Sequence, residues 1–304
     1  MDVESSSTIG AKRIVGEARS ILAEVVRTRV VGPDAAARAQ QIFDADGERW
    51  FAEDRPIRTI HADASMFVGG LRALLLQSLH PRAMAGVAQH SDYRNDPWGR
   101  LQRTADFLAA TTFGPRTEAE RAIATVRRVH TRVTGTTSDG RRYDANDPHL
   151  LKWVHIAEAD SFVRAHRRFG SVRLTASDYD RYVADMAVVA EHLGVIEPPR
   201  SVRQLAHQLQ DYRAELHGTP EARSAARYLL VTPPLPMAVR PAYGILGAAA
   251  VSLLPLWARR PLLLPWFPVS ERAVVRPAGE ALVRALRWAL TDERVALRHD
   301  AGRA

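Results

Sequence analysis

The segment DPWGRLQRTADFLAATTFG, residues 96–114, carries the start and stop signals of one complete helix. Asp96 is placed to cap the first turn, and Pro97 occupies the first helical position, where a backbone N–H has no partner within the helix. Gly114 follows the last apolar residue and supplies a stop. The segment therefore predicts a helix that fills this whole interval.

A second helix is predicted directly after it, from TEAERAIATVRRVHTRVTG, residues 117–135. Thr117 followed by Glu120 has the capping-box spacing, and Gly135 supplies the stop. The apolar stripe of this helix contains one titratable ring. The members of the stripe are Ile123, Val126, His130 and Val133.

Helical patterns continue on both sides, and strand signals are scarce. Gly69 and Gly70 permit close helix contact, and we found no repeat or composition change that marks a domain boundary. The sequence predicts an all-α fold in a single domain over residues 1–304, with roughly the first ten residues disordered. The other helical segments are residues 12–30, a helix capped by Asp34, residues 65–90 with a break at Pro81, residues 149–170, and a helix from the cap Thr175 to the stop Gly194.

Composition restricts the chemistry available to the chain. Its 304 residues include 42 Lys+Arg and 34 Asp+Glu, which gives a formal net charge of +8. Because this excess is spread along the chain, we expect no nucleic-acid partner. The chain has no cysteine, which excludes disulfides, thiolate nucleophiles, iron–sulfur clusters and cysteine-ligated metals. A metal must therefore be held by His, Asp, Glu, Tyr or Met.

The hydropathy of the chain does not predict a membrane-spanning protein. The N-terminal segment begins with acidic residues and has no apolar signal region, so we expect a cytoplasmic protein. The longest apolar run, residues 242–254, is shorter than the roughly 20 residues that a spanning helix needs. Flanked by Arg240 and Arg259, it is either a buried helix, which we favour, or an interfacial one. Peripheral membrane contact through residues 242–268 stays open.

Motifs for phosphate binding, serine hydrolysis and the common zinc or di-iron helices are absent from the sequence. His130 is then either a core histidine bonded to a backbone carbonyl or a ligand. On the preceding predicted helix, Arg100, Arg103 and Thr104 project from one face. That face is either a solvated arginine surface or one that needs a compensating anion. In the solvated case the available partners are Asp92, Asp96 and Asp106.

Five short motifs between residues 80 and 148 occur in a fixed order. They are HP at 80–81, R-x-x-R-T at 100–104, FG at 113–114, V-R-x-V-H at 126–130 with Gly135, and Y-x-A-x-D-P at 143–148. In their order and spacing they resemble the MpaB and latex-clearing-protein family of oxygenases. The resemblance covers residues 45–215 well and the tail more weakly.

The resemblance implies an all-helical fold that binds one b-type haem per chain. The family histidine that matches His130 is the proximal iron ligand, and the distal side carries an arginine that matches Arg100 and a threonine that matches Thr104. A neutral imidazole on an apolar helix face suits haem iron, while arginines meet its propionates or a bound ligand. We therefore expect His130 to hold the iron and Arg100 to contact the cofactor. The expected catalytic side chains are Arg100, Arg103 and Thr104.

Two departures from the family pattern limit what the resemblance implies. Where latex-clearing proteins have a lysine that can approach the iron, this chain has Arg103, whose guanidinium stays protonated. The sixth coordination position is therefore expected to be empty or filled by water. Latex-clearing proteins also use a glutamate base upstream of the distal arginine, whereas this chain has only Asp92 and Asp96 as carboxylates there. Rubber cleavage itself is therefore not expected.

Three further residues are weaker candidates. His80 either lines the cofactor pocket or supports His130, or it is only the kink residue before Pro81. His155 lies on a helix that we expect to pack nearby, and Asp160 is placed to accept a hydrogen bond from a histidine.

The sequence thus predicts a haem b oxygenase that uses O2 on an apolar substrate, an unsaturated lipid or isoprenoid. One alternative is a haem-binding sensor or carrier on the same fold without turnover, because a shared scaffold hosts different functions. Another is a helical protein without haem that docks on anionic lipid through residues 242–268. Substrate-dependent O2 consumption and vesicle binding distinguish the three.

Overall fold

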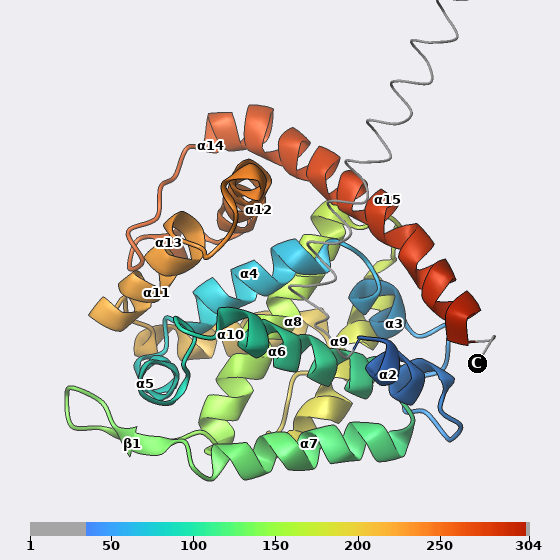
Figure 1. Cartoon of the computed structure of the whole chain (residues 1–304). Helices are drawn as coiled ribbons and strands as arrows, with labels where there is room; N and C mark the ends of the chain where they lie inside the picture. The colour runs from blue at the N-terminus through green and yellow to red at the C-terminus, as the bar shows by residue number, and fades with distance from the viewer. Residues whose placement is uncertain (1–34, 302–304) are drawn as a thin grey trace, which may run out of the picture.

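The computed structural model describes residues 35–301, and helices make up nearly all of their regular structure (Figure 1). Among these residues the only strands are β1 (Thr134–Thr136) and β2 (Arg142–Asp144), so the all-α prediction is confirmed. The predictions for residues 1–30 and Asp34 lie outside the described residues. The helices are α2 (Ala35–Ala39), the π-helix η2 (Gln40–Asp44), α3 (Pro56–His61), α4 (Met66–Gln77), α5 (Pro81–His90), α6 (Pro97–Phe113), α7 (Arg116–His130), α8 (Pro148–Phe169), α9 (Ala176–Leu193), α10 (Val202–Asp211), the 3-10 helix η3 (Tyr212–Glu215), α11 (Pro220–Val231), the 3-10 helix η4 (Met237–Val239), α12 (Arg240–Ser252), α13 (Leu256–Arg259), α14 (Pro268–Ser270), the π-helix η5 (Glu271–Val275) and α15 (Arg276–Ala301).

The core is built around one close pair of helices, α4 and α8. Buried side chains occur on all sides of α8, among them Trp153 and Ile156. Gly69 of α4 packs directly on this helix, because a Cβ atom at Gly69 would lie 2.6 Å from Phe162 Cδ1. The close contact predicted from Gly69 is therefore confirmed, whereas a Cβ atom at Gly70 would meet nothing within 4 Å.

A buried ion pair fixes α4 against α8. Arg72 Nη2 lies 2.7 Å from Asp160 Oδ2, and Arg164 Nε lies 2.9 Å from Asp160 Oδ1. Arg72 also donates to Ser161 Oγ over 2.6 Å and to the backbone oxygen of Leu253 over 3.1 Å. The expectation that Asp160 accepts from a histidine is wrong, because two arginines occupy its oxygens. Loss of one partner from such a buried pair costs about 3–5 kcal/mol.

Helices α6 and α7 form a hairpin on the outside of this core. As predicted, Asp96 caps α6 by accepting a hydrogen bond from Gly99 N over 2.9 Å, and Gly114 ends the helix. The predicted capping box of α7 is wrong: Pro115 precedes its first residue, and no side chain caps it. Glu120 instead pairs with Arg116 Nε over 3.1 Å, because both residues lie inside the helix.

Helix α7 ends at His130, short of the predicted stop at Gly135. Beyond a turn the chain enters an antiparallel hairpin in which Gly135 pairs with Tyr143. Side-chain packing requires the glycine there, since a Cβ atom at Gly135 would lie 2.5 Å from the Tyr143 hydroxyl. His130 is therefore the last residue of its helix, and Val133 continues the predicted stripe only after the helix has ended.

The other sequence signals for helix ends agree with the structure. Pro81 is the first residue of α5, so the chain breaks after His80 as predicted. Thr175 forms a capping box with Asp178 at the start of α9, and Gly194 ends that helix with φ of 109°. Left-handed backbone of this kind is what glycine supplies at a helix end without steric cost.

The apolar run 242–254 lies mostly in α12, which packs against α4 and α15 (Figure 1). Its small side chains are buried at Ala249, Ala250 and Val251. The buried-helix interpretation of this run is therefore confirmed. In the part of the chain that the structure describes, every helix falls short of the length and apolarity needed to cross a membrane.

Candidate active site

His130 lies at the end of α7 with its side chain half-buried. Its Nδ1 atom is fully buried, and so is Asn146 Oδ1, which acts on the ring as a hydrogen-bonding neighbour. Burial lowers the pKa of His130, although the charge of Asp144 and the Asn146 side chain oppose this effect. The ring is therefore neutral near pH 7, and no main-chain oxygen satisfies its buried nitrogen.

The α6–α7 hairpin brings the first turns of α6 level with the last turns of α7. Only Gly114 and Pro115 separate the two helices, and the helices pack along each other as antiparallel neighbours (Figure 1). Arg100 near the start of α6 and His130 at the end of α7 consequently lie at the same end of the hairpin. This geometry unites two residues that the sequence places 30 positions apart.

The three predicted catalytic side chains on α6 differ in exposure. Arg100 is half-buried and donates to Ser91 Oγ, and burial together with the charge of Arg103 lowers its pKa. Arg103 is exposed, and its Nη1 lies 3.2 Å from Asp96 Oδ2. Thr104 is also exposed and donates to the Arg100 carbonyl over 3.0 Å. The structure thus shows one of the solvent-side ion pairs that the sequence left open, between Arg103 and Asp96. Of the three side chains, only Arg100 is partly shielded from solvent.

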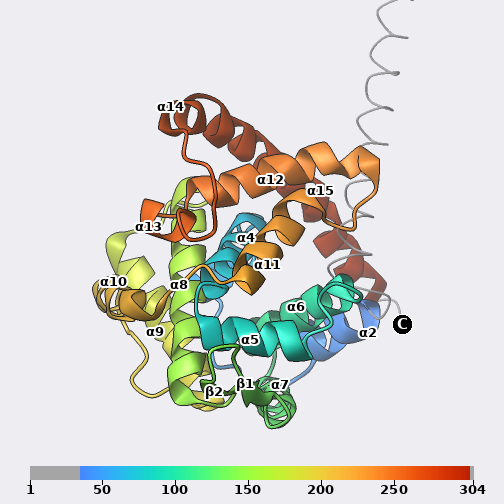
Figure 2. The ribbon, with the colours of Figure 1, turned by 90° about the vertical axis from the view of Figure 1, so that its left-hand side faces the viewer.

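The end of α5 connects these helices to the β-hairpin, as Figure 2 shows in the part of the molecule where α5, β1 and α7 meet. His90 Nε2 lies 3.0 Å from the Thr134 oxygen and 3.1 Å from the Tyr143 hydroxyl. Tyr143 in turn donates to Gln89 Oε1 over 2.6 Å. Because Ser91 holds Arg100, one connected layer supports both Arg100 and the hairpin that follows His130.

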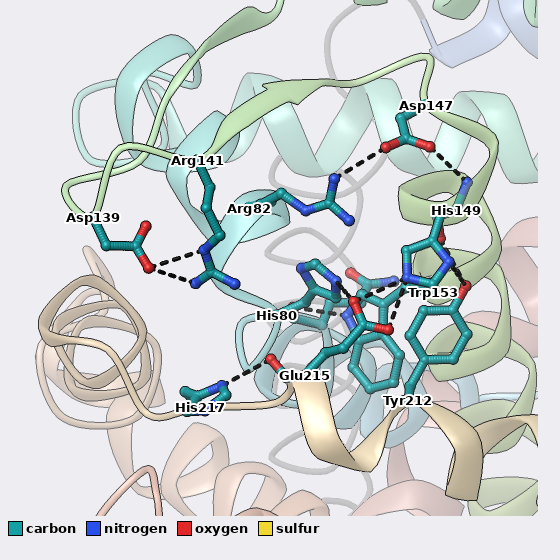
Figure 3. Close-up of polar contacts among 11 residues, drawn as sticks. His80, Arg82, Asp139, Arg141, Asp147, His149, Trp153, Tyr212, Glu215 and His217 are labelled. Carbon is teal, nitrogen blue, oxygen red and sulfur yellow. Dashed lines mark hydrogen bonds and ion pairs between the residues drawn. The ribbon is translucent and has the colours of Figure 1, made fainter.

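His80 does not contact His130 but lies in a second polar cluster (Figure 3). Its Nε2 is 3.3 Å from Glu215 Oε2, and His149 Nε2 is 2.9 Å from both Glu215 oxygens. Among the described residues this is the group of histidines and carboxylates close enough to hold a metal ion, with ligand atoms within 4.8 Å of one another. The role of His80 in cofactor binding stays a prediction.

Burial sets the charge state of this second cluster. It lowers the pKa of His80 to about 4, an effect that Glu215 opposes, so the ring is neutral at pH 7. Burial alone would raise the pKa of Glu215, but the hydrogen bond and charge of His149 and the charge of His80 outweigh it, and the pKa lies below its ordinary value. Glu215 is therefore a carboxylate.

The comparison with protein families decides the reaction class. A family model described as the ER-bound oxygenase mpaB/B'/rubber oxygenase catalytic domain matches residues 58–288. The chain belongs to this family. It is therefore an oxygenase-type catalytic domain, and the predicted enzyme class, oxidoreductase, is confirmed at that level. Neither a curated protein nor a solved structure matches the chain significantly.

The range matched to the MpaB and rubber oxygenase family contains every residue predicted for the site. It also contains a buried polar group that the sequence did not reveal. His61 Nδ1 lies 2.7 Å from Thr112 Oγ1, and His61 Nε2 lies 3.2 Å from the Tyr182 hydroxyl. Burial lowers the pKa of His61 to about 3 and of His155 to about 4, and it raises that of Glu158 to about 7.

Other residues of the site were not predicted from the sequence, for different reasons. Asn146 and Tyr143 lie within the Y-x-A-x-D-P motif, so a signal was present. His149 follows that motif directly, but its partner Glu215 carries no local signal. A contact between residues that far apart depends on how α8 and η3 pack, which no short pattern encodes.

Proposed function

We propose that the chain is a haem b-dependent oxygenase that uses O2 on an apolar, lipid- or isoprenoid-like substrate, with His130 as proximal ligand of one haem per chain. Membership of the oxygenase family supports the reaction class. The single observation that carries the cofactor assignment is the half-buried, neutral ring of His130, which lies at the same end of the α6–α7 hairpin as Arg100.

The residues around His130 fit an imidazole ligand. With Asn146 Oδ1 accepting from Nδ1–H, the lone pair is left on Nε2, and the ring orientation is fixed. Iron-ligating histidines are commonly held by such an acceptor on their other nitrogen. The lowered pKa of His130 favours the neutral ring that a metal needs. Asn146 is thus a positioning residue.

When bound, haem supplies the redox chemistry of O2 activation. The chain supplies charge and orientation: Arg100, partly shielded from water, presents donors to an anionic oxygen or a carboxylate. Arg103 adds positive charge at the surface and cannot ligate iron as an amine can. The Thr104 hydroxyl, now bonded to the Arg100 carbonyl, is a further donor on this face.

Cleavage of rubber is not part of the proposal, because a free carboxylate base is missing upstream of Arg100. Asp96 caps α6 and pairs with Arg103, while Asp92 accepts from Asn95 Nδ2 over 2.5 Å. Both aspartates between His80 and Arg100 are thus engaged. A smaller apolar substrate, not a polymer, is the class that we propose.

We place the protein in the cytoplasm and propose peripheral contact with membranes, without a nucleic-acid partner. The structure describes large exposed apolar side chains after α13, with exposed fractions of 53% at Trp266 and 64% at Phe267. Exposed Arg260 and Arg272 flank them, which suits an anionic lipid surface. Contact would therefore involve the end of the predicted 242–268 segment and not the buried α12.

A haem-binding sensor or carrier is the second candidate, favoured by the exposure of Arg103 and Thr104, which leaves two of the three distal groups to solvent. Oxygen uptake by haem-loaded protein separates the two functions. An oxygenase consumes O2 when unsaturated lipids or isoprenoids are added together with a reductant. Fully loaded protein that consumes no O2 with any of these substrates would support the carrier.

A further inference from the structure

The second polar cluster is assembled from three separate parts of the chain. His80 precedes α5, His149 lies in the first turn of α8, and Glu215 ends η3 (Figure 3). Bonds outside the cluster hold these parts together. Arg82 Nη1 lies 3.2 Å from Asp147 Oδ2, while the amide of His217 donates to the Leu79 carbonyl over 2.8 Å. The side chains therefore face one another on a braced framework.

The hydrogen bonds of His149 indicate which ring nitrogen carries a proton. The Tyr212 hydroxyl donates to the His149 carbonyl over 2.8 Å, so its hydrogen is engaged there. The same hydroxyl lies 3.2 Å from His149 Nδ1 and can only accept from it. With Nδ1–H bonded to Tyr212, Nε2 faces two carboxylate oxygens 2.9 Å away. Either a proton or a metal ion must therefore lie between Nε2 and the carboxylate.

His80 presents a second ring nitrogen to the same carboxylate. Its side chain is almost completely buried, and Trp153 and Tyr212 pack around it. Its Nδ1 is buried without a hydrogen-bond partner, while Nε2 points to Glu215. A fixed, buried imidazole of this kind is preorganised for a ligand.

We propose that His80 Nε2, His149 Nε2 and the Glu215 carboxylate bind a divalent transition-metal ion such as Zn²⁺, at a site separate from the haem. Two imidazoles and one carboxylate are a ligand set for zinc-like ions and not for Ca²⁺ or Mg²⁺. Tetrahedral Zn–N bonds of about 2.0–2.1 Å set ligand atoms about 3.3 Å apart. The separations of 2.9 and 3.3 Å from Glu215 oxygens are close to this value.

The partial exposure of His149 and Glu215, whose side chains are 43% and 38% exposed, leaves room for water on the ion. Tyr212 takes the supporting role on His149 Nδ1 that outer groups have in known zinc sites. The ion would join the starts of α5 and α8 to η3. Bound metal would therefore stabilise the folded chain.

The test is isothermal titration of Zn²⁺ into chelator-treated holoprotein, with metal content measured by elemental analysis. We expect one Zn²⁺ per chain and a raised midpoint of thermal unfolding. Glu215→Gln keeps the shape of the side chain but loses its charge, and His149→Ala loses a ligand. Each should weaken Zn²⁺ binding by at least about tenfold, since loss of supporting groups alone has effects of that size.

The chain offers a matched control in His207, an exposed histidine whose Nδ1 lies 3.1 Å from Asp211 Oδ2 without a second imidazole. His207→Ala should bind Zn²⁺ as the wild type does. The proposal is overturned if the wild type binds no stoichiometric Zn²⁺ or if Glu215→Gln binds it equally well. Haem is measured separately: Glu215→Gln should keep its haem, and His130→Ala should keep its Zn²⁺, so failure of either site is recognised by itself.

Discussion

At the scale of single residues, both proposed sites contain buried polar atoms. Three such atoms are His130 Nδ1, Asn146 Oδ1 and His80 Nδ1. Folded proteins leave few buried polar groups unsatisfied, because each costs free energy. Two of the three atoms lie beside each other at the proposed haem site, and the third lies in the proposed metal site. A ligand at Nε2 of His130 or His80 would hold each ring in place with its Nδ1 inside the protein.

The two arginines of α6 should contribute unequally to turnover. We expect Arg100→Ala to lower kcat by about 10²–10³-fold, the usual effect of removing one preorganised donor from a shielded site. Arg103 is exposed and paired with Asp96, so water and salt screen its charge, and Arg103→Ala should have a smaller effect. Steady-state O2 uptake by variants with equal haem content measures this. Equal losses would contradict the placement of Arg100 as the shielded donor.

Glu158 should make the stability of the protein depend on pH. Burial raises its pKa from 4.5 to about 7, so between these values the folded protein keeps a proton that the unfolded chain has released. The free energy of unfolding therefore falls as pH rises in this window, by up to about 1.4 kcal/mol per pH unit. Glu158→Gln stays neutral and should gain stability over the wild type from pH 5 to 7.

Urea unfolding at several pH values measures this difference. Glu53→Gln, the same substitution at an exposed glutamate, provides the control. Buried histidines such as His61 titrate in wild type and variants alike and cancel in the comparison. A Glu158→Gln curve parallel to that of the wild type would show that the carboxyl is not desolvated.

At the scale of elements, local sequence signals predicted a helix end correctly where a capping side chain or a glycine stop sets that end. Asp96, Thr175 and Gly194 act as their residue types predict. Thr117 has the same local pattern but caps nothing, because the helix already begins at Arg116, directly after Pro115. The end at His130 instead of Gly135 follows from pairing with β2, a tertiary contact that helical periodicity does not contain.

The difference between Asp96 and Thr117 is measurable. Asp96→Ala removes a side-chain cap and an ion pair with Arg103, and should lower the free energy of unfolding by about 1 kcal/mol. Thr117→Ala removes no cap and should stay within about 0.5 kcal/mol of the wild type. Chemical denaturation of both variants gives these values. A destabilisation by Thr117→Ala as large as that by Asp96→Ala would restore the capping box predicted from the sequence.

At the scale of the whole molecule, the sequence was sufficient for the fold class and the family, because helical periodicity and ordered motifs extend over most of the chain. It was not sufficient for the second cluster, since His80, His149 and Glu215 meet only when three segments pack. The membrane contact predicted for residues 242–268 stays a prediction. The apolar run around Ala250 is core, and exposed apolar residues follow it.

The proposed membrane contact predicts binding to vesicles that contain anionic lipid. We expect the protein to co-sediment with phosphatidylserine vesicles and to be released by salt, because arginines contribute to the attraction. The double variant Trp266→Ser and Phe267→Ser should stay in the supernatant. Ile196, 63% exposed elsewhere on the molecule, is the control, and Ile196→Ser should still bind. Equal sedimentation of the double variant would contradict a contact at this site.

The central claim is that the imidazole of His130 binds haem iron, and the absorption spectrum of freshly purified protein tests it most directly. We expect a Soret band with one haem per chain, as a single axial histidine implies. His130→Ala should abolish the band, while His80→Ala and the exposed-site variant His207→Ala should keep it. Full haem content with an unchanged spectrum in His130→Ala would contradict the claim.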